Sequence, residues 1–207
     1  FDTMVHLTEE NDFIVLEGDE YLSSPIDRRP KFHLYQPNIA LISGIAWDHI
    51  NVFPTYENYV EQFEIFIGKI TNGGILVYNE EDAEVKRVSK EATNPIRKLP
   101  YHTPKYTVSN GVTLLETPEG DMPIEVFGAH NLNNLAGAKW ICQNMGVDEA
   151  DFYEAIASFK GASKRLEKIA ESKTKVAYKD FAHSPSKVAA TTKAVKEQYP
   201  NRILIAC

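Results

Sequence analysis

Two apolar runs that end abruptly in acidic or imidazole side chains constrain the fold of this chain more than any other feature. The first is FIVLEGDE (residues 13–20) and the second is NIALISGIAWDH (residues 38–49). Such runs are typical of buried strands whose carboxyl ends open onto a ligand crevice. If the two strands are neighbours, the carboxylates and His49 meet at one sheet edge and suit a divalent cation that faces phosphate oxygens. The alternative is that these polar groups are simply solvated strand ends.

The rest of the sequence predicts alternating strands and helices. Thr55 caps a helix whose apolar residues recur at helical spacing through Ile70, and residues 75–79 form a short buried strand. This order predicts an α/β fold with a mainly parallel sheet flanked by helices. Residues 96–127 have β periodicity, with a hairpin turn at PEGD (residues 118–121). Further predicted elements are an edge strand at 32–35, helices at 80–90, 130–145, 148–159 and 185–198, and strands at 165–172, 175–182 and 202–207.

Composition excludes several classes of protein. The formal net charge of −7 argues against a nucleic-acid binder, because phosphate contacts need a basic surface. No apolar run approaches the roughly 20 residues that a membrane-spanning helix requires. Two widely separated cysteines, Cys142 and Cys207, suggest a reducing compartment, so we expect a cytoplasmic protein.

Five short motifs occur in an order that resembles the ATP-dependent Mur ligases. They are EGDE (17–20), WDH (47–49), FGAHNLNN (127–134), GASKRLE (161–167) and KDFAHSPSKV (179–188). The resemblance runs from about residue 13 to the end of the chain. It implies that residues 1–173 are most of a central ATP-binding domain with a small β-hairpin region. Residues 174–207 would then begin a Rossmann-like C-terminal domain with a strand, a helix and a strand, the boundary lying near 172–175.

The resemblance also implies a cation site. Glu17 and His49 match the Mg²⁺ ligands of the family, and Asp48 would orient the His49 ring. Arg165 matches the arginine that reaches the nucleotide phosphates, a role suited to a forked and permanently charged group. Glu17, His49 and Arg165 are therefore the residues on which we expect catalysis to depend.

Nucleotide recognition is implied for two further segments. His130, Asn131 and Asn134 resemble the segment that recognises adenine, although polar caps of a helix N-terminus are the simpler explanation of these residues alone. Asp180 would contact the ribose or phosphate region, and His183 lies in the same loop. Either could instead be an exposed polar residue after a strand. The remaining histidines, His6, His33 and His102, match no motif and are expected to be structural or solvated.

The activity that the resemblance implies is an ATP- and Mg²⁺-dependent ligase of cell-wall peptidoglycan. It would join UDP-N-acetylmuramate to an amino-acid or peptide acceptor through an acyl phosphate. Phe63 stands where many members carry a modified lysine, which favours the branch that adds L-alanine or recycles a tripeptide. EGDEY and GIAWDHINVF favour the recycling enzyme, whose acceptor is L-Ala-γ-D-Glu-meso-diaminopimelate. The alternatives are an L-alanine ligase, a folylpolyglutamate-type synthetase and a non-catalytic scaffold with the same fold.

Two departures from the family pattern affect these expectations. Ser184 occupies the position where a second histidine is expected after His183. The chain contains no GxxGKT segment, whose backbone amides and lysine would hold the phosphates. The chain therefore resembles an excised piece of a longer protein, and we expect it to be inactive by itself.

Overall fold

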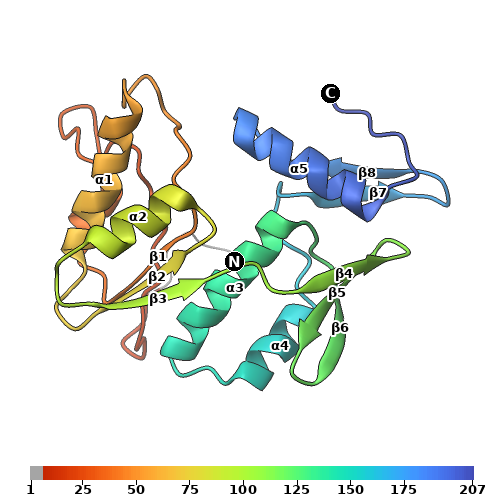
Figure 1. Cartoon of the computed structure of the whole chain (residues 1–207), viewed down its shortest axis with the longest axis horizontal. Coiled ribbons are helices and arrows are strands. Elements are labelled where there is room, and N and C mark those ends of the chain that lie inside the picture. The colour runs from red at the N-terminus through yellow and green to blue at the C-terminus, as the bar shows by residue number, and fades with distance from the viewer. Residues whose placement is uncertain (1–6) are drawn as a thin grey trace.

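The computed structural model describes residues 7–207, and its first part is a three-stranded parallel sheet (Figure 1). The strands are β1 (Ile39–Ile42), β2 (Ile75–Asn79) and β3 (Arg97–Tyr101), with β2 in the centre. Ile39 pairs with Ile75, which in turn pairs with Arg97. The predicted α/β fold with a parallel sheet is confirmed, and the start of the predicted β region supplies its third strand.

Helices cover both faces of this sheet. Successive side chains of a strand point to opposite faces, so apolar side chains on both faces need a packing partner. The helices concerned are α1 (Tyr56–Lys69), α2 (Ala83–Glu91) and α3 (Ala129–Asn144). Ala40 and Leu76 pack in one core cluster with side chains of α1 and α2. On the other face, a Cβ atom on Gly137 of α3 would lie 3.0 Å from both Leu41 Cδ1 and Tyr101 Cζ. A glycine at this position therefore lets α3 pack closely against the sheet.

The first two helices begin at side-chain caps, as their sequences favour. Thr55 Oγ1 accepts a hydrogen bond from the backbone N–H of Asn58 at 3.1 Å, which confirms the predicted start of α1. Asp82 caps α2 in the same way, with its Oδ1 accepting from the backbone N–H groups of Glu84 and Val85. None of the helices within residues 7–207 is long and apolar enough to cross a membrane.

Three of the predicted strands were wrong. Residues 13–16 are irregular, with side chains 53–82% exposed, and residues 203–207 are irregular too. Residues 32–35 fall largely in a 3₁₀ helix, η1 (Lys31–Leu34). The physical reason is that a strand needs a neighbour for its backbone hydrogen bonds, and an apolar run does not reveal whether one exists. Among the described residues only β2 pairs with β1, so the expected pairing of the first two runs was also wrong.

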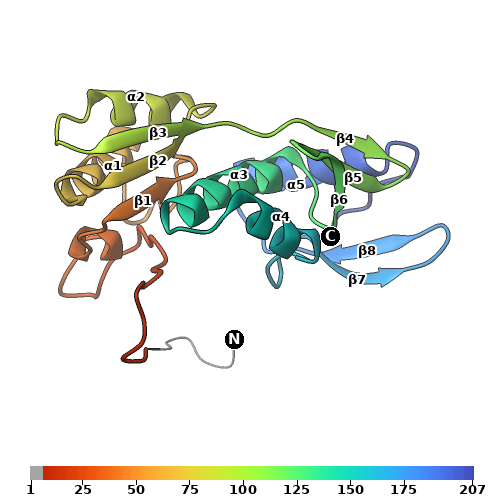
Figure 2. The ribbon, with the colours of Figure 1, turned by 90° about the horizontal axis from the view of Figure 1, so that it is seen from below.

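A second sheet is antiparallel and lies on the far side of α3 (Figure 2). It contains β4 (Tyr106–Ser109), β5 (Val112–Thr117) and β6 (Gly120–Ile124), and it packs against α3 and α4 (Glu149–Ala157). Its core includes Leu115 and Ile124 from the sheet and Leu132 from α3. The predicted hairpin is confirmed, since Thr117 pairs with Gly120 across Pro118 and Glu119.

The C-terminal part consists of a hairpin and a helix. Strands β7 (Glu167–Glu171) and β8 (Val176–Lys179) pair antiparallel, and α5 (Pro185–Gln198) follows with its proline in the first turn, as predicted. Phe127, Leu166 and Ala194 form a small core with Tyr178. The predicted domain boundary at 172–175 coincides with the turn of this hairpin, and the division into two domains stays a prediction.

Candidate functional site

The WDH motif lies in an irregular loop between β1 and α1, and several hydrogen bonds fix its course. Ile45 N–H donates to Asp82 Oδ2 at 3.1 Å, and Trp47 Nε1 donates to the carbonyl oxygen of Phe53 at 3.0 Å. At the centre of the loop, His49 has a φ of 53°, in the left-handed region that residues other than glycine rarely adopt. The loop is therefore held in a specific conformation, although it is neither helix nor strand.

The side chain of His49 contacts the EGDE segment. Its Nε2 lies 3.4 Å from Glu20 Oε1, and its ring packs edge-on against Tyr21 with centroids 4.9 Å apart. Tyr59 Oη on α1 donates to the same Glu20 oxygen at 3.4 Å. The structure thus brings together a carboxylate and the imidazole, as the sequence predicts, but the carboxylate is that of Glu20.

Both carboxylate oxygens of Asp48 accept hydrogen bonds. Its Oδ1 accepts the backbone N–H of His49 at 2.8 Å, and its Oδ2 accepts from Lys187 Nζ at 2.9 Å. Burial raises the pKa of Asp48, but the Lys187 and His49 hydrogen bonds outweigh this effect and lower the pKa below its ordinary value. The structure therefore joins Asp48 to the His49 backbone and to Lys187, and the expectation that Asp48 orients the His49 ring stays a prediction.

Glu17 is exposed, and its carboxylate makes no hydrogen bond or ion pair with any residue in 7–207. Within the same residues no three His, Cys, Asp or Glu side chains are close enough to hold a metal ion. A pair of ligands nevertheless suits Mg²⁺, which takes few protein ligands and fills its octahedron with water and phosphate oxygens. His49 with Glu17 or Glu20 has the right donor chemistry, and the assignment of Glu17 and His49 to a cation stays a prediction.

The residues predicted to contact adenine lie in the first two turns of α3. Asn131 Nδ2 donates to the carbonyl oxygen of Phe127 at 2.9 Å, so this amide stabilises the start of the helix, while Asn134 is exposed. Burial lowers the pKa of His130, and the nearby Asp180 partly opposes this shift. Sequence reasoning missed Asn133, which is buried and donates to Glu81 Oε2 at 3.1 Å, joining α3 to the end of β2.

Asp180 is held from two sides and is not an exposed residue after a strand. Its Oδ1 accepts the backbone N–H of Leu166 at 3.1 Å, and its Oδ2 accepts from Thr191 Oγ1 at 2.7 Å. Burial raises the pKa of Asp180, but the bond from Thr191 and backbone amides together lower it. Beside it, the Arg165 guanidinium lies 5.6 Å from the Phe181 ring centroid, and the exposed His183 contacts the Phe181 carbonyl through Nδ1. Arg165, Asp180 and His183 therefore lie in one region, with His130 next to Asp180.

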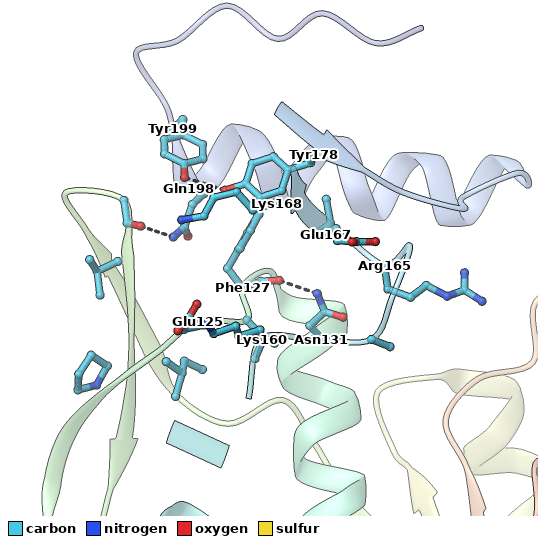
Figure 3. A pocket seen from close by; sticks show the side chains of 18 of the residues that line it. Glu125, Phe127, Asn131, Lys160, Arg165, Glu167, Lys168, Tyr178, Gln198 and Tyr199 are labelled. Carbon is cyan, nitrogen blue, oxygen red and sulfur yellow. Dashed lines mark hydrogen bonds between the residues drawn. The ribbon is translucent and has the colours of Figure 1, made fainter. Parts of the chain in front are cut away.

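A cavity of about 870 Å³ lies between the second sheet, α5 and the β7–β8 hairpin (Figure 3). Asn131 and Arg165 are among its lining residues. In Figure 3 the Arg165 side chain points away from Lys168 and Gln198, which lie at the opposite side of the cavity. The other charged lining residues are Glu167, which lies in the GASKRLE motif, and Glu125, Lys160 and Lys168, which no motif indicated. Of the unmatched histidines, His33 is buried, His102 is exposed, and His6 lies outside the described residues.

A family model and individual relatives both match this chain to the same protein family. A model described as the Mur ligase middle domain matches residues 2–142. The chain is 28% identical over 95% of its length to the UDP-N-acetylmuramate–L-alanyl-γ-D-glutamyl-meso-2,6-diaminoheptandioate ligase of Escherichia coli (strain K12). It is 29% identical over 95% of its length to the UDP-N-acetylmuramate–L-alanine ligase of Porphyromonas gingivalis (strain ATCC 33277). The chain spans 44% of the length of each of these relatives.

A solved structure supports the same fold. The murein peptide ligase of Psychrobacter arcticus superposes with a TM-score of 0.62 and 20% sequence identity, covering 96% of this chain and 44% of that one. At this identity the likeness concerns the fold alone.

Proposed function

This chain belongs to the Mur ligase family, and from that premise we propose that the protein containing it is an ATP-dependent ligase of peptidoglycan metabolism. Its substrate would be UDP-N-acetylmuramate, and its acceptor the tripeptide L-Ala-γ-D-Glu-meso-diaminopimelate. The observation that carries this proposal is the similarity to the E. coli ligase, which extends over 95% of the chain and so includes both the WDH loop and the Asp180 region.

In the proposed reaction, the lactoyl carboxylate of the muramyl group attacks the γ-phosphorus of ATP and forms an acyl phosphate, with ADP leaving. The acceptor amine then attacks the acyl carbon, and a tetrahedral intermediate collapses to the amide and inorganic phosphate. Phosphoryl transfer depends mainly on positioning and on neutralising charge. Mg²⁺ would supply part of that neutralisation at the phosphate oxygens.

The residues of this chain would divide the work of binding. His49, with the carboxylate of Glu17 or Glu20, would hold the cation. Arg165 would contact the phosphates, because its planar guanidinium carries a permanent charge and several donors. Asp180 would contact the ribose or phosphate region, and His183 would lie in the same loop. His130, Asn131 and Asn134 would face the adenine base.

The cation assignment predicts a large loss of activity on substitution. Glu17→Ala or His49→Ala in the full-length protein should lower kcat by at least about 100-fold, equivalent to about 2.7 kcal/mol of transition-state stabilisation. Glu20→Ala, measured in parallel, shows which carboxylate accompanies His49. Steady-state phosphate release at saturating ATP and Mg²⁺ is the measurement. If both Glu17→Ala and His49→Ala change kcat by less than threefold, these residues do not bind the catalytic cation.

The acceptor is tested with the full-length protein, ATP, Mg²⁺ and UDP-N-acetylmuramate, adding either the tripeptide or L-alanine. We expect phosphate release with the tripeptide only. Release with L-alanine only would establish the second candidate, which is favoured by relatives such as the P. gingivalis enzyme. If neither acceptor causes phosphate release, the protein uses a different acceptor or is a non-catalytic scaffold.

A further inference from the structure

One face of α5 contacts four separate parts of the molecule. Residues 187, 191, 194 and 198 follow the spacing i, i+4, i+7 and i+11, which places them along one face of a helix. From the first turn to the last, this face is made of Lys187, Thr191, Ala194 and Gln198. Figure 1 shows one end of α5 pointing toward the part that contains α1 and α2, while its length runs beside the β7–β8 hairpin.

Each residue of this face has a defined neighbour. Thr191 donates to Asp180, and the Ala194 methyl would lie only 2.4 Å from a Cβ atom on Gly128, just before α3. At the last turn, Gln198 Nε2 donates to the carbonyl oxygen of Gly111 at 2.6 Å. The helix is therefore held along three of its turns. It contacts the segments that carry Asp180 and His130, which we call the nucleotide region, and the turn between β4 and β5 of the second sheet.

The first turn of α5 is attached to the WDH loop through Lys187. Its Nζ donates to Asp48 Oδ2 at 2.9 Å, across a separation of 139 residues in the sequence. The Asp48 side chain is 20% exposed and the Lys187 side chain 44%, so this is a partly exposed ion pair of the kind that contributes at most about 1 kcal/mol. Because the other oxygen of Asp48 accepts the His49 N–H, one carboxylate links the lysine directly to the backbone of His49.

The backbone of His49 needs such support. Its φ of 53° is unfavourable for a residue with a Cβ atom, so the loop keeps this conformation only where its surroundings impose it. Val52 N–H and Phe53 N–H both donate to the His49 carbonyl oxygen, at 2.8 and 3.0 Å, and hold that side of the residue. Among residues 7–207, the His49 N–H bonds only to Asp48, and Asp48 in turn accepts a hydrogen bond from Lys187.

We propose that Lys187 is a positioning residue: through Asp48 it holds the His49 loop in the conformation that binds the cation, and it couples this loop to the nucleotide region along α5. This inference rests on the proposed function. It predicts that losing the lysine weakens the response to Mg²⁺ while leaving the capacity for turnover largely intact, because Lys187 bonds to Asp48 and not to the His49 ring or to Glu20 beside it.

The test compares Lys187→Ala, Lys187→Arg and a control, Lys193→Ala. Lys193 lies on the same helix, is exposed and makes no ion pair with any described residue. In the full-length protein, Lys187→Ala should raise the free Mg²⁺ concentration for half-maximal phosphate release by about three- to fivefold, which corresponds to the loss of an ion pair worth up to about 1 kcal/mol. At saturating Mg²⁺, kcat should change by less than about threefold. Lys187→Arg should restore the Mg²⁺ response, and Lys193→Ala should match the unaltered protein.

A second measurement separates this inference from the proposed function. Amide hydrogen exchange of residues 46–51 in the 207-residue chain should become about threefold faster in Lys187→Ala than in Lys193→Ala, since the loop loses one supporting interaction. Equal exchange in the two variants would overturn the inference, as would faster exchange with an unchanged Mg²⁺ response. An unaltered full-length protein that releases no phosphate from ATP would instead refute the proposed function, and the positioning role with it.

Discussion

At the scale of single residues, His33 shows how burial decides the behaviour of a titrating group. It lies in η1, and its Nε2 donates to the carbonyl oxygen of Gln62 on α1 at 2.8 Å. Burial lowers the pKa of His33; the hydrogen bond to Gln62 partly opposes this shift, and the positive charges of Lys69 and Arg29 add to it. The folded protein therefore contains a neutral imidazole that links η1 to α1.

This residue predicts how stability depends on pH. Between the lowered pKa of folded His33 and the ordinary value near 6.5, the unfolded chain binds more protons than the folded one. The free energy of unfolding should thus fall as the pH decreases below about 6.5, by at most about 1.4 kcal/mol per pH unit for this histidine. His33→Gln, which keeps a donor for Gln62, should remove this part of the decrease. Urea unfolding at several pH values is the measurement.

His102 offers a matched control, because it is exposed and can receive the same substitution. His130, whose pKa burial also lowers, should contribute a similar decrease that remains in His33→Gln. If His33→Gln and His102→Gln lose stability in parallel with the unaltered chain from pH 7.5 to 5.5, His33 does not contribute as proposed.

At the scale of elements, the contact between the start of α3 and α5 depends on Gly128. This residue has a φ of 87°, and a Cβ atom on it would lie 2.4 Å from Ala194 Cβ. Glycine is therefore required twice, for its backbone conformation and for the close approach of the two elements. The α5 helix packs here against the same turn that carries His130 and Asn131.

Gly128→Ala should destabilise the chain by about 2–4 kcal/mol, of which at least about 1 kcal/mol comes from a backbone conformation (φ 87°, ψ 140°) that favours glycine and the rest from overpacking. Gly73→Ala is the matched control, since Gly73 has a φ of 79° with open space around its Cβ position. The difference between the two variants in the free energy of unfolding, measured with denaturant, gives the contribution of the contact with Ala194. Equal losses in the two variants would contradict it, whereas partial recovery in Gly128→Ala combined with Ala194→Gly would support it directly.

Elements with local signals could be predicted from the sequence, and elements that depend on a distant partner could not. Thr55 and Pro185 mark helix starts through groups within one turn, so α1 and α5 were placed correctly. The strands expected at residues 13–16 and 202–207 have suitable residues but no neighbour among the described ones. The 3₁₀ helix at residues 31–34 was missed for the related reason that a short apolar run fits either structure.

At the scale of the whole molecule, the motifs predict which regions belong to the candidate site but not how those regions are connected. WDH and KDFAHSPSKV were both recognised, yet nothing in their spacing indicates that Lys187 of the second reaches Asp48 of the first. The carboxylate beside His49 was likewise expected to be Glu17, because residues that meet only through the tertiary fold carry no local pattern. Asn133 was missed for the same reason, since its partners Asn79, Glu81 and Thr103 come from other elements.

Trp47 can serve as a fluorescent reporter of the WDH loop, because its indole is hydrogen-bonded within that loop. The indole spans the loop that holds Asp48 and His49, and the chain has only one other tryptophan, Trp140 on α3. Replacing Trp140 with phenylalanine would leave a single tryptophan, whose emission, excited at wavelengths where tyrosine does not absorb, follows the environment of this loop. The arrival of a cation or nucleotide could then be timed by stopped-flow fluorescence, without any attached dye.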